Sequence, residues 1–214
     1  MLSISKDTLA QLPPAIYGGK CHIVDTHSRS REAANFLLKC RTIGFDTETR
    51  PSFQKGRTHK VALLQFATDD ECFLFRVNKT GIGKELRKLI ESTDILKIGL
   101  STSDDFHALQ RLQPDICPDG FLDLQQWVKN YEILDNSLSR IHAIIFGEKI
   151  SKSQRLTNWE AETLSDLQQQ YAALDAWACL KIYRHLESGL FDPGASPYTI
   201  EENPTTDNKN EISC

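Results

Sequence analysis

The stretch IGFDTET, residues 43–49, has the alternating pattern of a short β-strand. Side chains in a strand repeat every two residues, so Asp46 and Glu48 leave the same face with their carboxylates roughly 6–7 Å apart. Two like charges held this close repel each other unless a positive group neutralises them. A divalent cation with oxygen ligands would do so, although a strand edge that turns both carboxylates toward water also explains the pair. Further carboxylates that reach the same point would favour the cation.

Length and composition predict one folded domain. The chain has 214 residues, of which 40% are hydrophobic and 25% are charged, and these values are ordinary for a globular protein. No run approaches the ~20 apolar residues that a membrane span needs, and the first residues lack the apolar core of a signal peptide. We therefore expect a cytoplasmic protein without membrane contact.

Cysteine usage and net charge exclude some kinds of site without identifying a partner. The formal net charge of −4 lacks the basic excess typical of a nucleic-acid binder. However, four acidic residues and one lysine after Ile200 account for −3 of that charge, and metal-binding carboxylates would add further negative charge. The absence of a C-x-x-C pair and of regular spacing argues against a zinc ribbon and a disulfide framework. The six cysteines are Cys21, Cys40, Cys72, Cys117, Cys179 and Cys214.

The order of the predicted elements is that of an α/β protein with a mixed sheet. Residues 61–67 and 72–77 are strongly β-like and flank a polar turn, which predicts an antiparallel hairpin after the strand at 43–49. A helix and a buried strand at 95–100 are expected next. Residues 1–19 are expected to be a lead-in segment and residues 191–214 a polar, acidic, flexible tail. The single domain would then span residues 20–190.

Two helical regions are predicted in the second half of the chain. Residues 122–147 are predicted to be mostly helical and to end at Gly147. The last helix is predicted to begin near the capping segment Thr163-Leu164-Ser165-Asp166 and to end at about Glu187. Asp175 lies beside its apolar stripe, where a carboxylate is costly unless it is bound to a metal or paired with an arginine at the boundary. That stripe consists of Leu167, Tyr171, Leu174, Ala178 and Ile182.

Asp104 and Asp105 lie at the junction of a strand and a helix, in the first turn of that helix. Acidic residues there complement the helix dipole without a catalytic role, and for one of the two that explanation is sufficient. The other could join the strand pair and Asp175. Four such carboxylates can clamp two divalent ions about 3.5–4 Å apart, which stabilise the attacking and leaving oxygens in phosphodiester hydrolysis. A tyrosine hydroxyl within reach could orient the water.

Three motifs in this order resemble the DEDD 3′–5′ exonucleases, in particular the branch of RNase D and the Werner-helicase exonuclease domain. The motifs are Phe45-Asp46-Thr47-Glu48, the segment from Gly99 through Asp105 to Leu109, and Tyr171-x-x-x-Asp175. The segments at 59–65 and 157–159 also match, so the resemblance covers about residues 20–188. It implies a ribonuclease H-like fold, in which α-helices flank a mixed β-sheet.

The resemblance also implies a role for each motif residue. Asp46 would bridge two divalent metal ions, Mg²⁺ or Mn²⁺, and Glu48 and Asp175 would complete the site that activates water. Asp105, four residues before the leucine of its motif, would hold the second metal directly or through water. Tyr171 would position the nucleophile, which assigns the tyrosine subclass, DEDDy.

The implied substrate is a single strand of DNA or RNA that enters with its 3′ end at the metals and releases nucleoside 5′-monophosphates. Among the residues that could hold this strand, Lys152 and Arg155 are explained more plainly as solvated charges in a loop. Trp159 is explained more plainly as a core aromatic residue. No obligate protein partner is inferred. The candidates for phosphate contact or stacking are Thr47, His107, Lys152, Arg155 and Trp159.

Two other functions fit part of the pattern. A non-catalytic nucleic-acid-binding module could keep the fold, but a decayed site would be expected to lose an acidic residue or Tyr171. A metal-dependent phosphoesterase for a small substrate would not need the family motifs. RNA and DNA both stay open, because contacts to 2′-hydroxyl groups depend on the geometry of the pocket.

Overall fold

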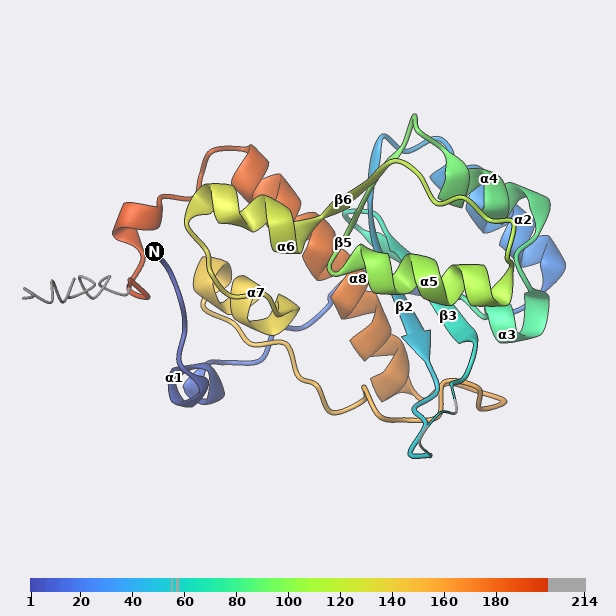
Figure 1. Ribbon diagram of the computed structural model, residues 1–214, viewed down its shortest axis with the longest axis horizontal. Helices are drawn as coiled ribbons and strands as arrows, with labels where there is room; N and C mark the ends of the chain where they lie inside the picture. The colour runs from blue at the N-terminus through green and yellow to red at the C-terminus, as the bar shows by residue number, and fades with distance from the viewer. Residues whose placement is uncertain (55, 57, 200–214) are drawn as a thin grey trace, which may run out of the picture.

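A six-stranded mixed β-sheet forms the centre of the protein (Figure 1), whose computed structural model describes residues 1–54, 56 and 58–199. The strand order is β1-β4-β3-β2-β5-β6. β3 runs antiparallel to both of its neighbours, and the other pairs are parallel. The predicted hairpin and the predicted mixed sheet are confirmed. The strands are β1 Lys20–Val24, β2 Thr42–Thr49, β3 Val61–Ala67, β4 Glu71–Phe75, β5 Leu96–Gly99 and β6 Phe121–Asp123.

Helices cover both faces of the sheet. Apolar residues of α2, α4 and α5 pack on one face, and α8 crosses the other. Figure 1 shows α1, α6 and α7 gathered on the left, beside the chain's N-terminus. The helices are α1 Lys6–Gln11, α2 His27–Leu37, α3 Val77–Thr80, α4 Lys84–Glu91, α5 Thr102–Leu112, α6 Leu124–Trp127, α7 Leu138–Phe146 and α8 Asp166–Glu187, with 3₁₀ turns at Val128–Tyr131 and Pro193–Ala195.

Close packing of α8 on β2 brings two acidic elements together. Gly44 faces α8, and a Cβ at this position would overlap the backbone carbonyl of Ala176. Because side chains alternate along a strand, Asp46 and Glu48 leave β2 on this same face. The helix approaches the strand closely because it carries small residues, which are fully buried: Ala172, Ala173, Ala176 and Ala178.

A capping box starts α8. The Ser165 hydroxyl accepts a hydrogen bond from the backbone N–H of Gln168, whose side chain accepts one from the backbone N–H of Ser165. The helix therefore begins within the predicted capping segment. Leu167 was placed in the inward stripe, but it is 68% exposed because the continuous buried face starts only at Ala172. Neither α8 nor any other described helix has the length and hydropathy of a membrane span.

The first residues are part of the fold rather than a separate lead-in. Leu2 and Ile4 are almost fully buried in an apolar cluster that also contains Ile133. The backbone N–H of Ser3 donates to the carbonyl oxygen of Tyr198, so the start of the chain lies beside residues 191–199. Apolar side chains near the N-terminus explain this packing. The rest of the predicted tail, residues 200–214, lies outside the described residues.

The region 122–147 is less helical than predicted. Residues 121–123 pair with β5 as a short parallel strand, and two short helices follow before α7. Glu132 has a left-handed backbone with φ of 61°, which ends the 3₁₀ turn at this point. Strand pairing, which is a long-range contact, therefore overrides the local helical pattern at the start of this region.

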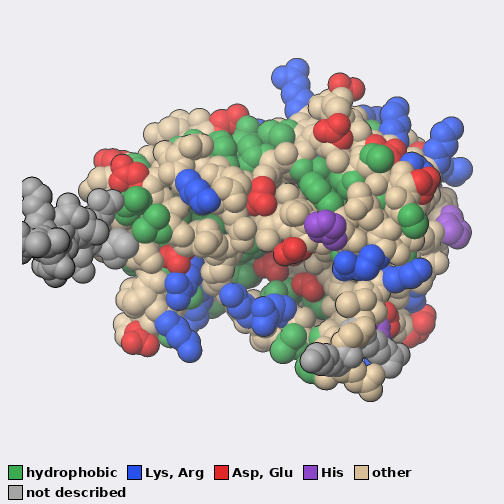
Figure 2. Space-filling model, viewed as in Figure 1, with side chains coloured by type: hydrophobic (Ala, Val, Ile, Leu, Met, Phe, Trp, Pro, Cys, Tyr) green, Lys and Arg blue, Asp and Glu red, His purple; other side chains and the backbone are tan. Residues whose placement is uncertain are grey.

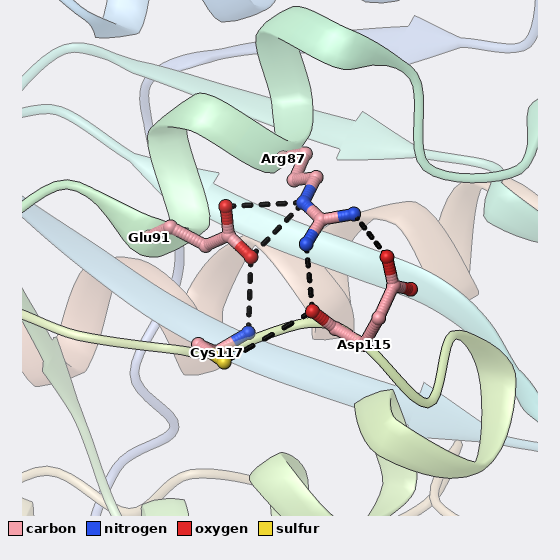
Figure 3. Close-up of polar contacts among 4 residues, drawn as sticks. All are labelled: Arg87, Glu91, Asp115 and Cys117. Atoms are coloured by element: carbon pink, nitrogen blue, oxygen red, sulfur yellow. Dashed lines mark hydrogen bonds and ion pairs between the residues drawn. The ribbon is translucent and has the colours of Figure 1, made fainter.

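An arginine network fixes the loop between α5 and β6 (Figure 3). The Arg87 side chain on α4 donates to both carboxylate oxygens of Glu91, at 3.0 and 3.1 Å, and to Asp115 at 2.6 Å. Glu91 in turn accepts a hydrogen bond from the backbone N–H of Cys117. The loop that leads into β6 is thereby held against α4.

Candidate active site

Three carboxylates from two elements meet near the C-terminal end of β2. One oxygen from each of Asp46, Glu48 and Asp175 lies within 4.8 Å of the other two. Glu48 is 8% exposed and Asp175 is 7% exposed, whereas Asp46 is half-buried. Figure 2 shows a hollow on this face of the molecule, with acidic side chains inside it and Lys and Arg side chains beside it. Residues far apart in the chain thus form one acidic pocket.

Asp105 joins this pocket from the other side of the sheet. It lies in the first turn of α5, and its Oδ1 accepts a 2.5 Å hydrogen bond from the Thr47 hydroxyl. The neighbouring Asp104 is exposed and contacts the Ser101 hydroxyl at 3.4 Å, as expected for a residue that only complements a helix start. Of the two candidates, Asp105 is therefore the one that contacts β2, between the two strand carboxylates in sequence.

Asp123, at the end of β6, supports this arrangement and was missed by the sequence analysis. Its carboxylate accepts hydrogen bonds from the backbone N–H groups of Ser101 and Thr102, at 2.9 and 3.2 Å. Ser101 has a left-handed backbone with φ of 61°, which is strained for a residue other than glycine. Asp123 therefore holds the turn that aims Asp105. An aspartate directly after a short apolar run was the available signal.

Burial and mutual repulsion oppose the simultaneous ionisation of Asp46, Glu48, Asp105 and Asp175. Burial raises the pKa of Asp46 well above its usual range, and the charge of Asp175 adds to this rise. Burial, followed by the charges of Asp46 and Asp175, raises the pKa of Glu48 to about 10. Burial and the charge of Asp46 raise the pKa of Asp105 to about 8. Burial also raises the pKa of Asp175 to about 7, although a hydrogen bond from Tyr171 lowers it.

The donor set fits hard divalent cations. All of the clustered groups offer carboxylate oxygens, which are the ligands that Mg²⁺ and Mn²⁺ prefer. A cation between them would balance the repulsion that otherwise keeps these carboxyls partly protonated. Asp46, Glu48 and Asp175 could share one cation, whereas Asp105 is outside this cluster and close enough for the charge of Asp46 to raise its pKa.

Tyr171 lies one helical turn before Asp175 on α8. Its hydroxyl interacts with the Asp175 carboxyl and lowers the pKa of that group. Burial, then the charges of Asp175 and Glu48, raises the pKa of Tyr171, so its hydroxyl is protonated at neutral pH. The Tyr171 side chain can therefore donate a hydrogen bond at the site but cannot serve as a base there.

Four of the five residues predicted to contact substrate are accessible, and one is not. His107, Lys152 and Arg155 are exposed, and Thr47 is half-buried beside Asp105. The positive charge of Arg155 acts on Glu48, which places the 151–156 loop near the acidic pocket. The prediction for Trp159 was wrong, because this residue is fully buried in an apolar cluster and has no ring face free for a base.

A second feature at the rim was not predicted. Phe53 is 85% exposed and Leu156 is 59% exposed, and both line a pocket of about 370 Å³ together with Arg50. Arg50 comes two residues after Glu48, and Leu156 comes directly after Arg155. The pocket is therefore built from chain segments that follow Glu48 and Arg155 in the sequence. An exposed phenylalanine in a polar loop was the missed signal.

Without divalent cations, Glu48 is expected to destabilise the protein as the pH rises. Its folded-state pKa of about 10 lies above the ordinary value of 4.5, so its stabilising contribution is complete below 4.5 and is lost as the pH approaches 10. We expect Glu48→Gln to raise the melting temperature in EDTA at about pH 8 by roughly 2–4 °C or more, equivalent to about 1 kcal/mol. Thermal unfolding from about pH 5 to about pH 9 measures this difference.

The exposed Glu32 on α2 provides the control for this measurement. Glu32→Gln should leave the melting temperature nearly unchanged across the same pH range. A difference between wild type and Glu48→Gln that stayed constant or shrank as the pH rose would contradict the assignment of Glu48 to a repelling cluster.

Comparison with known proteins gives consistent matches to one family. A family model described as 3′–5′ exonuclease matches residues 21–190. A 3′–5′ exonuclease of Arabidopsis thaliana is 32% identical over 152 residues, which cover 68% of this chain and 52% of that protein. An exonuclease mut-7 homolog of Aedes aegypti is 26% identical over 193 residues, which cover 79% of this chain and 27% of that protein. The chain thus spans about a quarter to a half of the length of these relatives.

A solved structure agrees with the sequence matches. The crystal structure of the Aedes aegypti Nibbler EXO domain superposes with a TM-score of 0.74 at 25% sequence identity. The match covers 84% of this chain and 96% of that domain. The described fold is therefore similar to that of this exonuclease domain.

Proposed function

Because this chain belongs to the 3′–5′ exonuclease family, we propose that it hydrolyses phosphodiester bonds from the 3′ end of single-stranded DNA or RNA. The products are nucleoside 5′-monophosphates. Asp46, Glu48, Asp105 and Asp175 hold two divalent cations, Mg²⁺ or Mn²⁺. The single observation that carries this proposal is the convergence of three carboxylates, from a strand and a distant helix, within 4.8 Å of one another.

Each residue has a distinct task in the proposed reaction. The bound cations supply Lewis-acid stabilisation of charge on the attacking and leaving oxygens. Asp46 sits centrally, since its charge raises the pKa of both Glu48 and Asp105. Tyr171 keeps its proton and orients the attacking water by a hydrogen bond. This use of tyrosine corresponds to the DEDDy subclass.

The incoming strand follows the rim pocket beyond the end of β2. The exposed ring of Phe53 offers a stacking platform for a base, and Leu156 offers an apolar contact across the same pocket. Arg50 lines this pocket, and the exposed Lys152 and Arg155 act electrostatically on Asp175 and Glu48, so all three are candidates to contact phosphates. Stacking does not depend on base identity, so this platform suits an enzyme that degrades strands of any sequence.

Replacing Phe53 is expected to weaken substrate binding. Loss of one base–aromatic stack costs about 1.4 kcal/mol or more, so Phe53→Ala should raise the KM for a single strand roughly tenfold with little change in kcat. Steady-state kinetics with a single-stranded oligonucleotide measures both constants. Phe36→Ala removes another exposed phenylalanine, on α2, and serves as the matched control. Equal effects of the two variants on KM would contradict the stacking role.

The proposed function is tested with 5′-labelled oligonucleotides. RNA, DNA and recessed duplexes are incubated with Mg²⁺ or Mn²⁺, with EDTA, and with the Asp46→Asn protein. We expect a ladder that shortens from the 3′ end, loss of the reaction in EDTA and its return when the cation is restored. Tight binding of a single strand by the wild-type protein without any shortening would instead identify a non-catalytic binding module.

A further inference from the structure

The side chain of Gln65 is buried and has no hydrogen-bond partner. It lies in the middle of β3 and is fully buried. Neither Nε2 nor Oε1 of its side chain has a partner, and in the described part of the chain no other buried side chain has two such atoms. Leaving an amide buried and unpaired costs about 1–3 kcal/mol, so this residue needs an explanation beyond stability.

The strand register places Gln65 beside the acidic pocket. Gln65 lies directly opposite Asp46 in the antiparallel pair of β2 and β3. Side chains directly opposite each other project from the same face of a sheet, with their Cβ atoms about 4.5–5.5 Å apart. The amide of Gln65 is therefore within side-chain reach of the Asp46 carboxylate.

Apart from the β2 carboxylates, Asp46 opposite it and Glu48 on the diagonal, the surroundings of Gln65 are apolar. Leu63 and Ala67 project from the same face on either side of it and belong to a cluster with Ala172 and Ala176 of α8. An apolar side chain of similar size would fill this space without the cost of an unpaired amide. Packing alone thus favours leucine or methionine here, and the feature that distinguishes the position is the carboxylate across the strand.

We propose that Gln65 is a positioning residue for Asp46, whose carboxylate accepts a hydrogen bond from the Gln65 amide when divalent cations are bound. This inference rests on the proposed function, because it requires the acidic pocket to bind cations. A hydrogen bond from a neighbouring residue fixes the orientation of a ligating carboxylate, and its loss typically weakens metal binding 10–100-fold.

Calorimetric titration of the metal-free protein with Mn²⁺ tests the proposal without measuring catalysis. We expect Gln65→Met to bind Mn²⁺ roughly 10–100-fold more weakly than wild type. Its melting temperature in EDTA should equal or exceed that of wild type, since the variant buries no unpaired amide. Leu63→Met changes packing on the same face of the same strand and should leave Mn²⁺ affinity unchanged. If Gln65→Met fails to fold, Gln65→Leu takes its place.

The outcomes separate this inference from the proposed function. Weaker Mn²⁺ binding by Gln65→Met, with normal binding by Leu63→Met, supports the positioning role. Equal binding by wild type and Gln65→Met overturns it while the proposed function stands, because the amide then serves only the packing of the strand. Absence of Mn²⁺ binding by the wild-type protein overturns both.

Discussion

Asp46→Asn is expected to abolish hydrolysis while the protein stays folded. Asp46 is the central carboxylate of the cluster, and an amide removes one anionic ligand where the proposed cations bind. Cations contribute several kcal/mol to the stabilisation of the transition state, so we expect the rate to fall on the order of 10³-fold or more. Single-turnover cleavage of a 5′-labelled strand measures this loss.

Two comparisons make the Asp46 result decisive. Asp104→Asn removes an exposed carboxylate that lies outside the cluster, and it should retain nearly full activity. In EDTA, Asp46→Asn should melt no lower than wild type, because asparagine has a similar shape and relieves repulsion. Near-normal cleavage by a folded Asp46→Asn protein would rule out the proposed cation site.

Local pattern predicts the part of the site that lies within single elements. Alternation along 43–49 places Asp46 and Glu48 on one face, and helical spacing places Tyr171 one turn from Asp175. Both relations depend only on the repeat of a strand or a helix. The convergence of the strand with the helix is a tertiary fact, and the resemblance to a known family rather than periodicity predicted it.

Long-range contacts explain what the sequence analysis missed. Asp123 supports the turn before α5 only because β6 pairs in parallel with β5. The unusual position of Gln65 becomes visible only once the register places it opposite Asp46. Burial of Trp159 likewise depends on distant chain segments that close over it. The relations of Gln65 and Trp159 have no short-range signature in the sequence, and the apolar run before Asp123 does not show which turn this residue supports.

The site also shows why its stability and its function conflict. Burial and mutual repulsion raise the pKa of the clustered carboxyls, which opposes folding as the pH rises. The same repulsion favours the binding of cations between them. Variants that lose a carboxylate should therefore gain stability without cations as they lose activity.

Tyr171→Phe is expected to slow hydrolysis by on the order of 10²-fold, the usual scale for the loss of help from a positioned acid–base group. The variant keeps the ring, whose centroid lies 6.1 Å from that of the Trp159 ring, and removes only the hydroxyl that is proposed to orient water. Since this hydroxyl also lowers the pKa of Asp175, the variant could act indirectly through that proposed ligand. Single-turnover rates at saturating Mn²⁺, together with calorimetric Mn²⁺ affinity, separate the two effects.

A loss of rate with unchanged Mn²⁺ affinity assigns the Tyr171 hydroxyl to the water, whereas a parallel loss of affinity assigns it to the orientation of Asp175. Tyr183→Phe supplies the matched control, because it removes a hydroxyl from the same helix that bonds to Glu187 at 2.7 Å. Its rate should equal that of wild type.

Because Tyr171 keeps its proton at neutral pH, the pH profile of the wild-type rate should show no titration of the Tyr171 hydroxyl between about pH 6 and about pH 9. An unchanged rate for Tyr171→Phe would remove tyrosine from the mechanism and leave the carboxylates alone to orient the nucleophile.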